Sequence, residues 1–219
     1  MIRKSFSIQK TVDVCFSQEL HSEIDEVFYL FHGYAQLPEY FIRHFERFFR
    51  PNRLFVAPQG PSTLYIQGTS GRVGASWMTK HNRLNDIADI NGYLNNLHES
   101  IKAHISPRAT FNTLSFSQGC AVTLRWLYQS SLKPKNIFIW GGTLPHDLPL
   151  ELQREKLAAS QLHIVNGVND PYLKDELHSG EIRRLFEDNH IPFEWHTFEG
   201  GHHLDAETLE RLIGIETSF

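Results

Sequence analysis

The sequence of 219 residues has little of several features that would place it in a specialised class of protein. It contains only two cysteines, Cys15 and Cys120, which are far apart and form no C-x-x-C motif. Isolated thiols argue against a disulfide framework and favour a reducing, cytoplasmic setting. No stretch approaches the roughly 20 apolar residues that span a bilayer, and the N-terminus lacks the apolar run of a signal peptide. We therefore expect no stable membrane insertion.

Positive charge is also scarce. Lysine and arginine number 21 against 25 aspartates and glutamates, which gives a net charge of −4 at pH 7. A chain with this balance has no electrostatic footprint for a phosphate backbone, so we expect no nucleic-acid partner. Its length and ordinary apolar content predict a single domain over residues 1–219. The oligomeric state stays open, and a homodimer is among the assemblies that the sequence allows.

Short apolar segments alternate with amphipathic ones along the chain. Residues 26–31 and 54–57 are nearly continuous in apolar side chains, as strands buried on both faces are, whereas residues 84–105 carry them at helical spacing. Further strands are expected at 136–140, 161–165 and 193–198, further helices at 38–50, 149–158, 173–189 and the C-terminus, one or two edge strands within 5–16, and a long loop at 59–81. This alternation predicts an α/β fold, with a mostly parallel sheet and helices on both faces.

One junction between a predicted strand and a predicted helix carries a serine in a distinctive setting. Ser117 stands between two small residues, Ser115 two positions before it and Gly119 two positions after it. This is the form of a nucleophile elbow, in which a sharp turn exposes the serine hydroxyl at the start of a helix. The helix N-terminus there favours developing negative charge. The first small residue is usually glycine, and the pentapeptide alone is also compatible with an incidental serine.

Two later strand ends carry the residue types that such a serine needs. Asp170 follows one predicted strand and His202 follows the last, so the chain has the order Ser…Asp…His of the α/β-hydrolase arrangement. An imidazole can take the proton of the weakly nucleophilic hydroxyl, and a carboxylate can orient that imidazole. Alternatives stay open: Asp170 could only cap a turn before Pro171, Asp147 and Asp175 are weaker candidates for the acid, and His203 rivals His202.

Several short segments in order along the chain strengthen this interpretation. They are His32-Gly-Tyr34, Ser76-Trp77, Phe116-Ser-Gln-Gly119, Gly142-Thr-Leu-Pro145, Asn166-Gly-Val-Asn-Asp170 and Gly201-His202. Together they resemble the α/β-hydrolase fold serine hydrolases of the carboxylesterase/phospholipase family, which includes acyl-protein thioesterase-like enzymes. The resemblance implies Ser117 as nucleophile, His202 as base and Asp170 as its orienting acid. It also implies an oxyanion hole formed by the backbone N–H groups of Tyr34 and Gln118.

Two positions depart from the family pattern, which usually has glycine in place of Ser115 and often in place of Ala35. Ser115 is small enough for the elbow. Ala35 is a larger change, because a Cβ disfavours positive φ and could reshape the oxyanion loop.

The sequence also suggests what surrounds the site. Trp77, in the predicted Gly/Ser-rich loop, and Leu144 are candidate walls of the substrate pocket, and we expect His32 to hold the oxyanion loop by hydrogen bonding. No cofactor and no metal site are expected: His98-Glu99 begins the H-E-x-x-H pattern, but Lys102 stands where the second histidine belongs.

The resulting hypothesis is a serine hydrolase that cleaves small-molecule or lipid-like carboxylic esters, with thioesters as a further substrate class. Two alternatives share the fold: a binding protein without catalytic activity and an acyltransferase with the same triad.

Overall fold

The computed structural model describes residues 1–2, 4–142, 144–145, 147–149, 154–172 and 176–214. The strands are β1 (Val14–Phe16), β2 (Glu26–Phe31), β3 (Arg53–Pro58), β4 (Ser62–Tyr65), β5 (Val73–Ser76), β6 (Thr110–Phe116), β7 (Asn136–Trp140), β8 (Gln161–Gly167) and β9 (Glu194–Phe198). The helices are α1 (Pro38–Phe41), the 3₁₀-helix η1 (Ile42–Phe48), α2 (Arg83–Lys102), α3 (Gln118–Gln129), α4 (Arg154–Ala158), α5 (Glu176–Asp188) and α6 (Ala206–Ile213).

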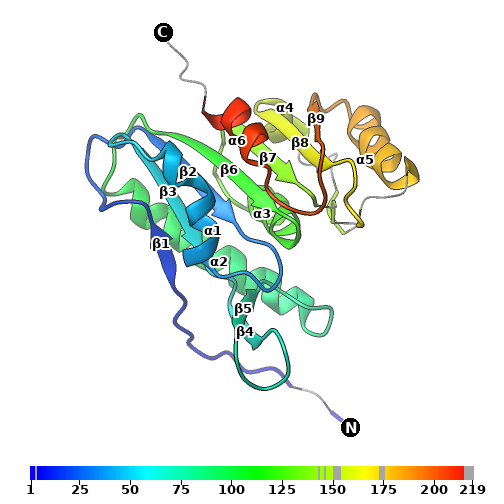
Figure 1. Cartoon of the computed structure of the whole chain (residues 1–219). Coiled ribbons are helices and arrows are strands. Elements are labelled where there is room, and N and C mark those ends of the chain that lie inside the picture. The colour runs from blue at the N-terminus through cyan, green and yellow to red at the C-terminus, as the bar shows by residue number, and fades with distance from the viewer. Residues whose placement is uncertain (3, 143, 146, 150–153, 173–175, 215–219) are drawn as a thin grey trace.

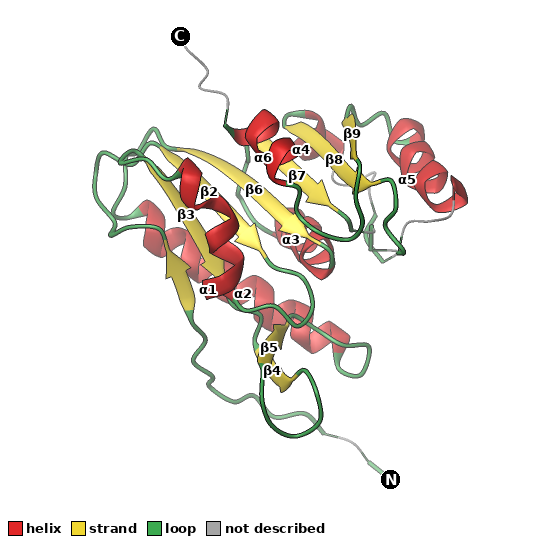
Figure 2. Cartoon of the chain, viewed as in Figure 1, coloured by secondary structure: helices red, strands yellow, loops and turns green. Residues whose placement is uncertain are grey.

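Seven strands form one twisted sheet in the order β1-β3-β2-β6-β7-β8-β9 (Figures 1 and 2). Every neighbouring pair is parallel except β1 and β3, which are antiparallel. The expected mostly parallel sheet is therefore confirmed. The carboxyl ends of six strands point to one edge, which is where parallel α/β sheets place their ligands.

Helices cover both faces of this sheet, as predicted. Alternate residues of β2 enter different cores: Val27, Tyr29 and Phe31 pack in the cluster that includes α2 and α3 residues, whereas Phe28 and Leu30 pack in the cluster that includes α1, η1 and α6 residues. A strand buried on both faces needs apolar side chains at every position, which explains the continuous apolar run in its sequence.

The N-terminal strand is shorter than the expected one or two strands within residues 5–16. Only Val14–Phe16 pairs, against β3, and Phe6 and Ile8 are each 85% exposed. Apolar alternation makes a strand only where a partner supplies backbone hydrogen bonds and a surface to pack on. Before Val14, the one backbone hydrogen bond to another segment among the described residues is at Asp13, whose carbonyl oxygen accepts from the N–H of Gln59 at 3.0 Å.

The predicted loop over residues 59–81 contains a hairpin. Strands β4 and β5 pair with each other in a separate antiparallel sheet, and Gly68 and Gly71 adopt positive φ in their connection. Strand β4 is mostly exposed, so its sequence lacks the apolar pattern that would have predicted a strand. Within the described part of the chain, no helix is both long enough and apolar enough to cross a lipid bilayer.

Candidate active site

The junction between β6 and α3 is a strained turn centred on Ser117. This residue has φ 53° and ψ −117°, a conformation that a non-glycine residue adopts only when its surroundings hold it there. Its N–H donates to the carbonyl oxygen of Trp140 at 2.9 Å. A Cβ on Gly119 would lie 2.3 Å from the carbonyl oxygen of Phe31, so only glycine lets α3 pack this closely against the end of β2.

Ser115 occupies the other small position of the turn. Its side chain is fully buried, and its hydroxyl donates to the carbonyl oxygen of Phe138 on the neighbouring strand at 2.9 Å. Its hydroxyl is therefore satisfied, and the departure from glycine is accommodated inside the sheet.

The side chains of Ser117, His202 and Asp170 form a continuous hydrogen-bonded chain. The Nε2 atom of His202 lies 2.9 Å from the Oγ of Ser117, and its Nδ1 lies 2.7 Å from the Oδ2 of Asp170. The three residues come from the turns after β6, β8 and β9 and meet at the carboxyl edge of the sheet. Both nitrogens of the imidazole are thus engaged, one by a hydroxyl and one by a carboxylate.

The carboxylate in this chain is held in a closed environment. Asp170 is only 1% exposed, and its second oxygen, Oδ1, accepts a hydrogen bond from the N–H of Tyr172 at 2.9 Å. Gly141, with φ 58°, lies so close that a Cβ there would be 3.3 Å from the His202 ring and 3.4 Å from Asp170. The ring of Tyr172 packs edge-on against His202, with centroids 4.7 Å apart. Neither Gly141 nor Tyr172 could be recognised from the sequence as a neighbour of the site, because the only indication is that each lies near the end of a strand.

The rival residues lie elsewhere. His203 packs against Phe198, and no hydrogen bond joins its ring to the triad residues among the described contacts. Asp147 forms ion pairs with Arg125 at 2.7 Å and Arg83 at 3.3 Å. Partial burial works against ionisation of Asp147, but the hydrogen bond and charge of Arg125 outweigh it and lower the pKa of this carboxyl. Asp175 lies outside the described residues.

Comparison with known families identifies the family of this chain. A family model described as Phospholipase/Carboxylesterase matches residues 16–214. The chain belongs to this family.

Solved structures with a similar fold include esterase PE8, at 19% identity and TM-score 0.64 over 93% of this chain and 96% of that one. Acyl-protein thioesterase 2 of Zea mays is 14% identical, with TM-score 0.67 over 94% and 97% of the two chains. A phospholipase/carboxylesterase of Dyadobacter fermentans is also 14% identical, with TM-score 0.69 over 95% and 99%. No curated protein matches the sequence. Identities this low show the shared α/β-hydrolase fold, and family membership supports ester hydrolysis in general.

The loop after β2 lies beside the turn at Ser117, since a Cβ on Gly119 would be 2.9 Å from the carbonyl oxygen of His32. Neither Tyr34 nor Gln118 donates a backbone hydrogen bond to any of the described residues. Between Tyr34 and the hairpin, Ala35 has φ 61°, and its N–H donates to the carbonyl oxygen of Ala75 at 2.8 Å. The departure from glycine at position 35 therefore leaves the left-handed backbone in place, held by the hairpin strand β5.

Beneath this loop, His32 joins three segments of the chain. Its Nδ1 lies 2.7 Å from the carbonyl oxygen of Gly33, and its Nε2 accepts a hydrogen bond from the N–H of Gly60 at 3.0 Å. Acceptance at Nε2 places the proton on Nδ1, so the ring is neutral. Burial lowers the pKa of His32 to about 4, which keeps it neutral at physiological pH. The expected role of His32 in holding this loop agrees with these contacts.

Trp77 and Leu144, which the sequence suggested as walls of the substrate pocket, are both buried, and that role stays a prediction. Trp77 is 0% exposed and Leu144 is 7% exposed, and both pack in the hydrophobic core. The indole N–H of Trp77 donates to the carbonyl oxygen of His32 at 2.9 Å, and its ring stacks on the imidazole with centroids 4.9 Å apart. Trp77 therefore holds His32 at the end of β2, since an indole satisfied by an internal carbonyl is stable in the core.

The side chain of Gln118 adds a link that the sequence did not reveal. Its Oε1 accepts from the N–H of Trp77 at 3.0 Å, and its Nε2 donates to the carbonyl oxygen of Met78 at 2.9 Å. The residue directly after the nucleophile thus fixes the segment that follows β5.

A hollow of about 940 Å³ lies at the other edge of the sheet. Residues at the amino ends of the strands line it, among them Glu26, Arg53, Thr110, Asn136 and Gln161. It is remote from Ser117, and we assign it no part in ester binding.

Proposed function

We propose that the protein is a serine hydrolase that cleaves carboxylic esters through a covalent acyl-enzyme, with the whole chain as one hydrolase domain. The observation that carries the proposal is the continuous chain from the Ser117 hydroxyl through His202 to the buried carboxylate of Asp170. A hydroxyl needs a base within hydrogen-bond reach to act as a nucleophile, and the base needs a partner that fixes its tautomer.

In the acylation step, the Oγ of Ser117 attacks the ester carbonyl carbon while Nε2 of His202 takes the hydroxyl proton. The C–O bond to the leaving alcohol then breaks, and the imidazolium returns the proton to that oxygen. Asp170 stays ionised, holds the proton on Nδ1 and stabilises the positive ring. In the second step, water replaces the alcohol, and the same base releases the carboxylic acid.

The negative charge that develops on the carbonyl oxygen needs donors that are already in place. We assign this role to the N–H groups of Tyr34 and Gln118, which have no other acceptor among the described residues. A donor of this kind contributes about 2.7–4 kcal/mol to transition-state stabilisation. The N-terminus of α3, directly after Ser117, adds a favourable dipole.

The substrate that this edge supports is a small-molecule or lipid-like ester. Tyr172, 72% exposed, lies against His202, and Tyr34, 56% exposed, belongs to the oxyanion loop. Exposed aromatic rings beside the nucleophile suit an apolar acyl or alcohol group. Thioesters present the same carbonyl to the same groups and belong to the proposed substrate range.

The decisive experiment compares the wild type with Ser117→Ala on aryl esters of graded acyl length. We expect kcat to fall by roughly 10⁶-fold, which leaves only the weak residual catalysis that the oxyanion donors and substrate binding supply. Ser70→Ala, which changes an exposed serine in the β4–β5 connection, is the matched control and should keep full activity. A fluorophosphonate should label the wild type but not the Ser117→Ala protein, because its phosphorus bonds to the activated Oγ. Turnover of Ser117→Ala within about tenfold of the wild type, or fluorophosphonate labelling that survives in this variant, would refute the proposal.

A further inference from the structure

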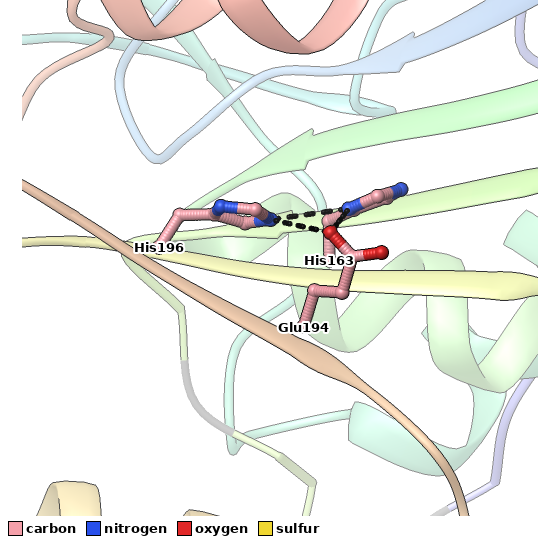
Figure 3. Close-up of side chains that lie close together, drawn as sticks. All are labelled: His163, Glu194 and His196. Carbon is pink, nitrogen blue, oxygen red and sulfur yellow. Dashed lines mark hydrogen bonds and ion pairs between the residues drawn. The ribbon is translucent and has the colours of Figure 1, made fainter.

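A second group of ionisable side chains lies away from the proposed catalytic residues, on the last two strands of the sheet. His163 belongs to β8, and Glu194 and His196 belong to β9 (Figure 3). His163 pairs in register with Glu194, and His196 is two residues further along β9. Because residues two apart share a face of a strand, all three side chains project from the same face.

The three donor atoms of this cluster converge. Nδ1 of His163 lies 3.1 Å from Nε2 of His196, and each of these nitrogens lies 3.5 Å from Oε2 of Glu194. A tetrahedral Zn²⁺ with bonds of about 2.0–2.2 Å separates its ligand atoms by about 3.3–3.5 Å. The three atoms therefore already have nearly the spacing of one triangular face of a zinc coordination tetrahedron.

We propose that His163, Glu194 and His196 form a binding site for a divalent transition-metal ion of the zinc class, with the fourth position left for water. Two imidazoles and one carboxylate are a donor set that zinc accepts, and imidazole ligands favour zinc, copper and nickel over magnesium or calcium. The proposal departs from the expectation that the sequence holds no metal site.

Burial and tautomers support this assignment. The side chains of His163 and His196 are about 10% exposed, whereas that of Glu194 is 65% exposed and leaves the site open to solvent. A neutral imidazole has one nitrogen with a lone pair and one that carries a proton. In the metal-free cluster, one proton lies between the two nitrogens as a hydrogen bond. An ion would replace that proton.

One neighbouring group works against metal binding: Arg211 on α6. Its Nη1 lies 3.4 Å from Nδ1 of His196, where it favours the tautomer with a proton on Nε2, the ligand atom. Its positive charge also repels a cation. Since Arg211 is exposed, its side chain can leave without disturbing the core. Arg211→Gln should consequently bind the metal more tightly than the wild type.

The site is separate from the ester-cleaving groups. His163 is the third residue of β8, whereas Asp170 follows the far end of that strand, and the remaining strand alone spans roughly 13 Å. A metal here joins β8 to the edge strand β9 and therefore stabilises the pair of strands that lead to Asp170 and His202. It takes no part in the reaction.

The test is titration of the metal-free, full-length protein with Zn²⁺ by calorimetry, and with Co²⁺, whose visible spectrum reports tetrahedral coordination. We expect one ion per chain and a higher Tm with Zn²⁺ than with chelator. Glu194→Gln, which changes an exposed side chain and should fold normally, and His196→Gln should each weaken binding at least about 10–100-fold. His81→Gln, at an exposed histidine in the segment before α2, is the matched control and should bind like the wild type.

Two results would overturn the assignment. One is the absence of stoichiometric binding, or equal binding by the wild type, Glu194→Gln and His196→Gln. The other is loss of the ion in Asp170→Asn but not in Glu194→Gln, which would locate it at His202 and Asp170 instead. Ester hydrolysis by Glu194→Gln should match the wild type, so failure of the metal proposal and failure of the hydrolase proposal give different results.

Discussion

Two places in the molecule combine imidazole with carboxylate, and they differ in which partner is buried. At the carboxyl edge, Asp170 is 1% exposed and contacts a single imidazole, whose other nitrogen faces the Ser117 hydroxyl. Toward the amino ends of β8 and β9, the carboxylate of Glu194 is 65% exposed and faces the imidazoles of His163 and His196. The first geometry, with its three groups in a row, suits the proton transfer that we propose. The second geometry brings three possible ligand atoms close together, as a metal ion requires. Similar residue types therefore suit different chemistry in the two places.

The largest effect that separates the two places should come from Asp170→Asn. An amide cannot stabilise the imidazolium and favours the wrong tautomer of His202, so kcat for an aryl ester should fall by on the order of 10⁴-fold. Zinc binding should be unchanged. The control is Asp147→Asn, at a carboxylate paired with Arg125 and Arg83, which should lose less than about tenfold. Equal losses in the two variants would remove the distinction between the two carboxylates.

A smaller effect should appear in acid, through the neutral His32 under the oxyanion loop. Its pKa of about 4 in the folded protein is below its ordinary value of 6.5, so the unfolded chain binds its proton first as the pH falls. Stability from this group is complete above pH 6.5 and declines toward pH 4, by about 3 kcal/mol.

Urea unfolding at pH 7 and pH 4 measures this loss. Burial is also the main cause of the lowered pKa values of His98, His163 and His196, so these histidines add to the total loss of stability in acid. The contribution of His32 is therefore measured as the difference in that loss between the wild type and a His32 variant. His32→Gln should lose distinctly less stability on acidification than the wild type, whereas His81→Gln should lose the same amount. Identical pH dependence in all three proteins would show that His32 is not held neutral in the fold.

The smallest effect should come from Ala35→Gly. A left-handed conformation costs a non-glycine residue about 1–2 kcal/mol, and Ala35 has φ 61°. Glycine relieves this strain but makes the unfolded chain more flexible, so we expect a net stabilisation of about 1 kcal/mol or less in urea unfolding. Because the hairpin already holds this backbone, ester hydrolysis should stay within about twofold. A large gain in activity would mean that Ala35 distorts the oxyanion loop.

Much of the fold could be predicted because the physical signal was local. The continuous apolar run of β2 and the helical spacing in α2 each reflect what one segment buries. The positions of Ser117, Asp170 and His202 at strand ends followed from the alternation of elements, and parallel strands place such ends at one edge.

The remaining features depended on pairings between segments distant in sequence. The metal cluster arises from the register of β8 against β9, which no spacing within either strand indicates. Trp77 seemed to belong to an exposed loop because its flanking residues are polar, yet His32 offers its indole an internal acceptor. The strands β4 and β5 bury little apolar surface, so their sequences carried almost no periodic signal.

The hairpin of β4 and β5 is joined to the loop around Ala35 by two backbone hydrogen bonds of Ala75. Its carbonyl oxygen accepts from the N–H of Ala35, and its N–H donates to the carbonyl oxygen of Gln36. At the far end of the hairpin, a Cβ added to Gly68 or Gly71 would meet no other atom within 4 Å. Exposed loop tips built from small residues tolerate inserted segments. The β4–β5 connection thus offers protein engineers an attachment point that is joined through Ala75 to the loop around Ala35.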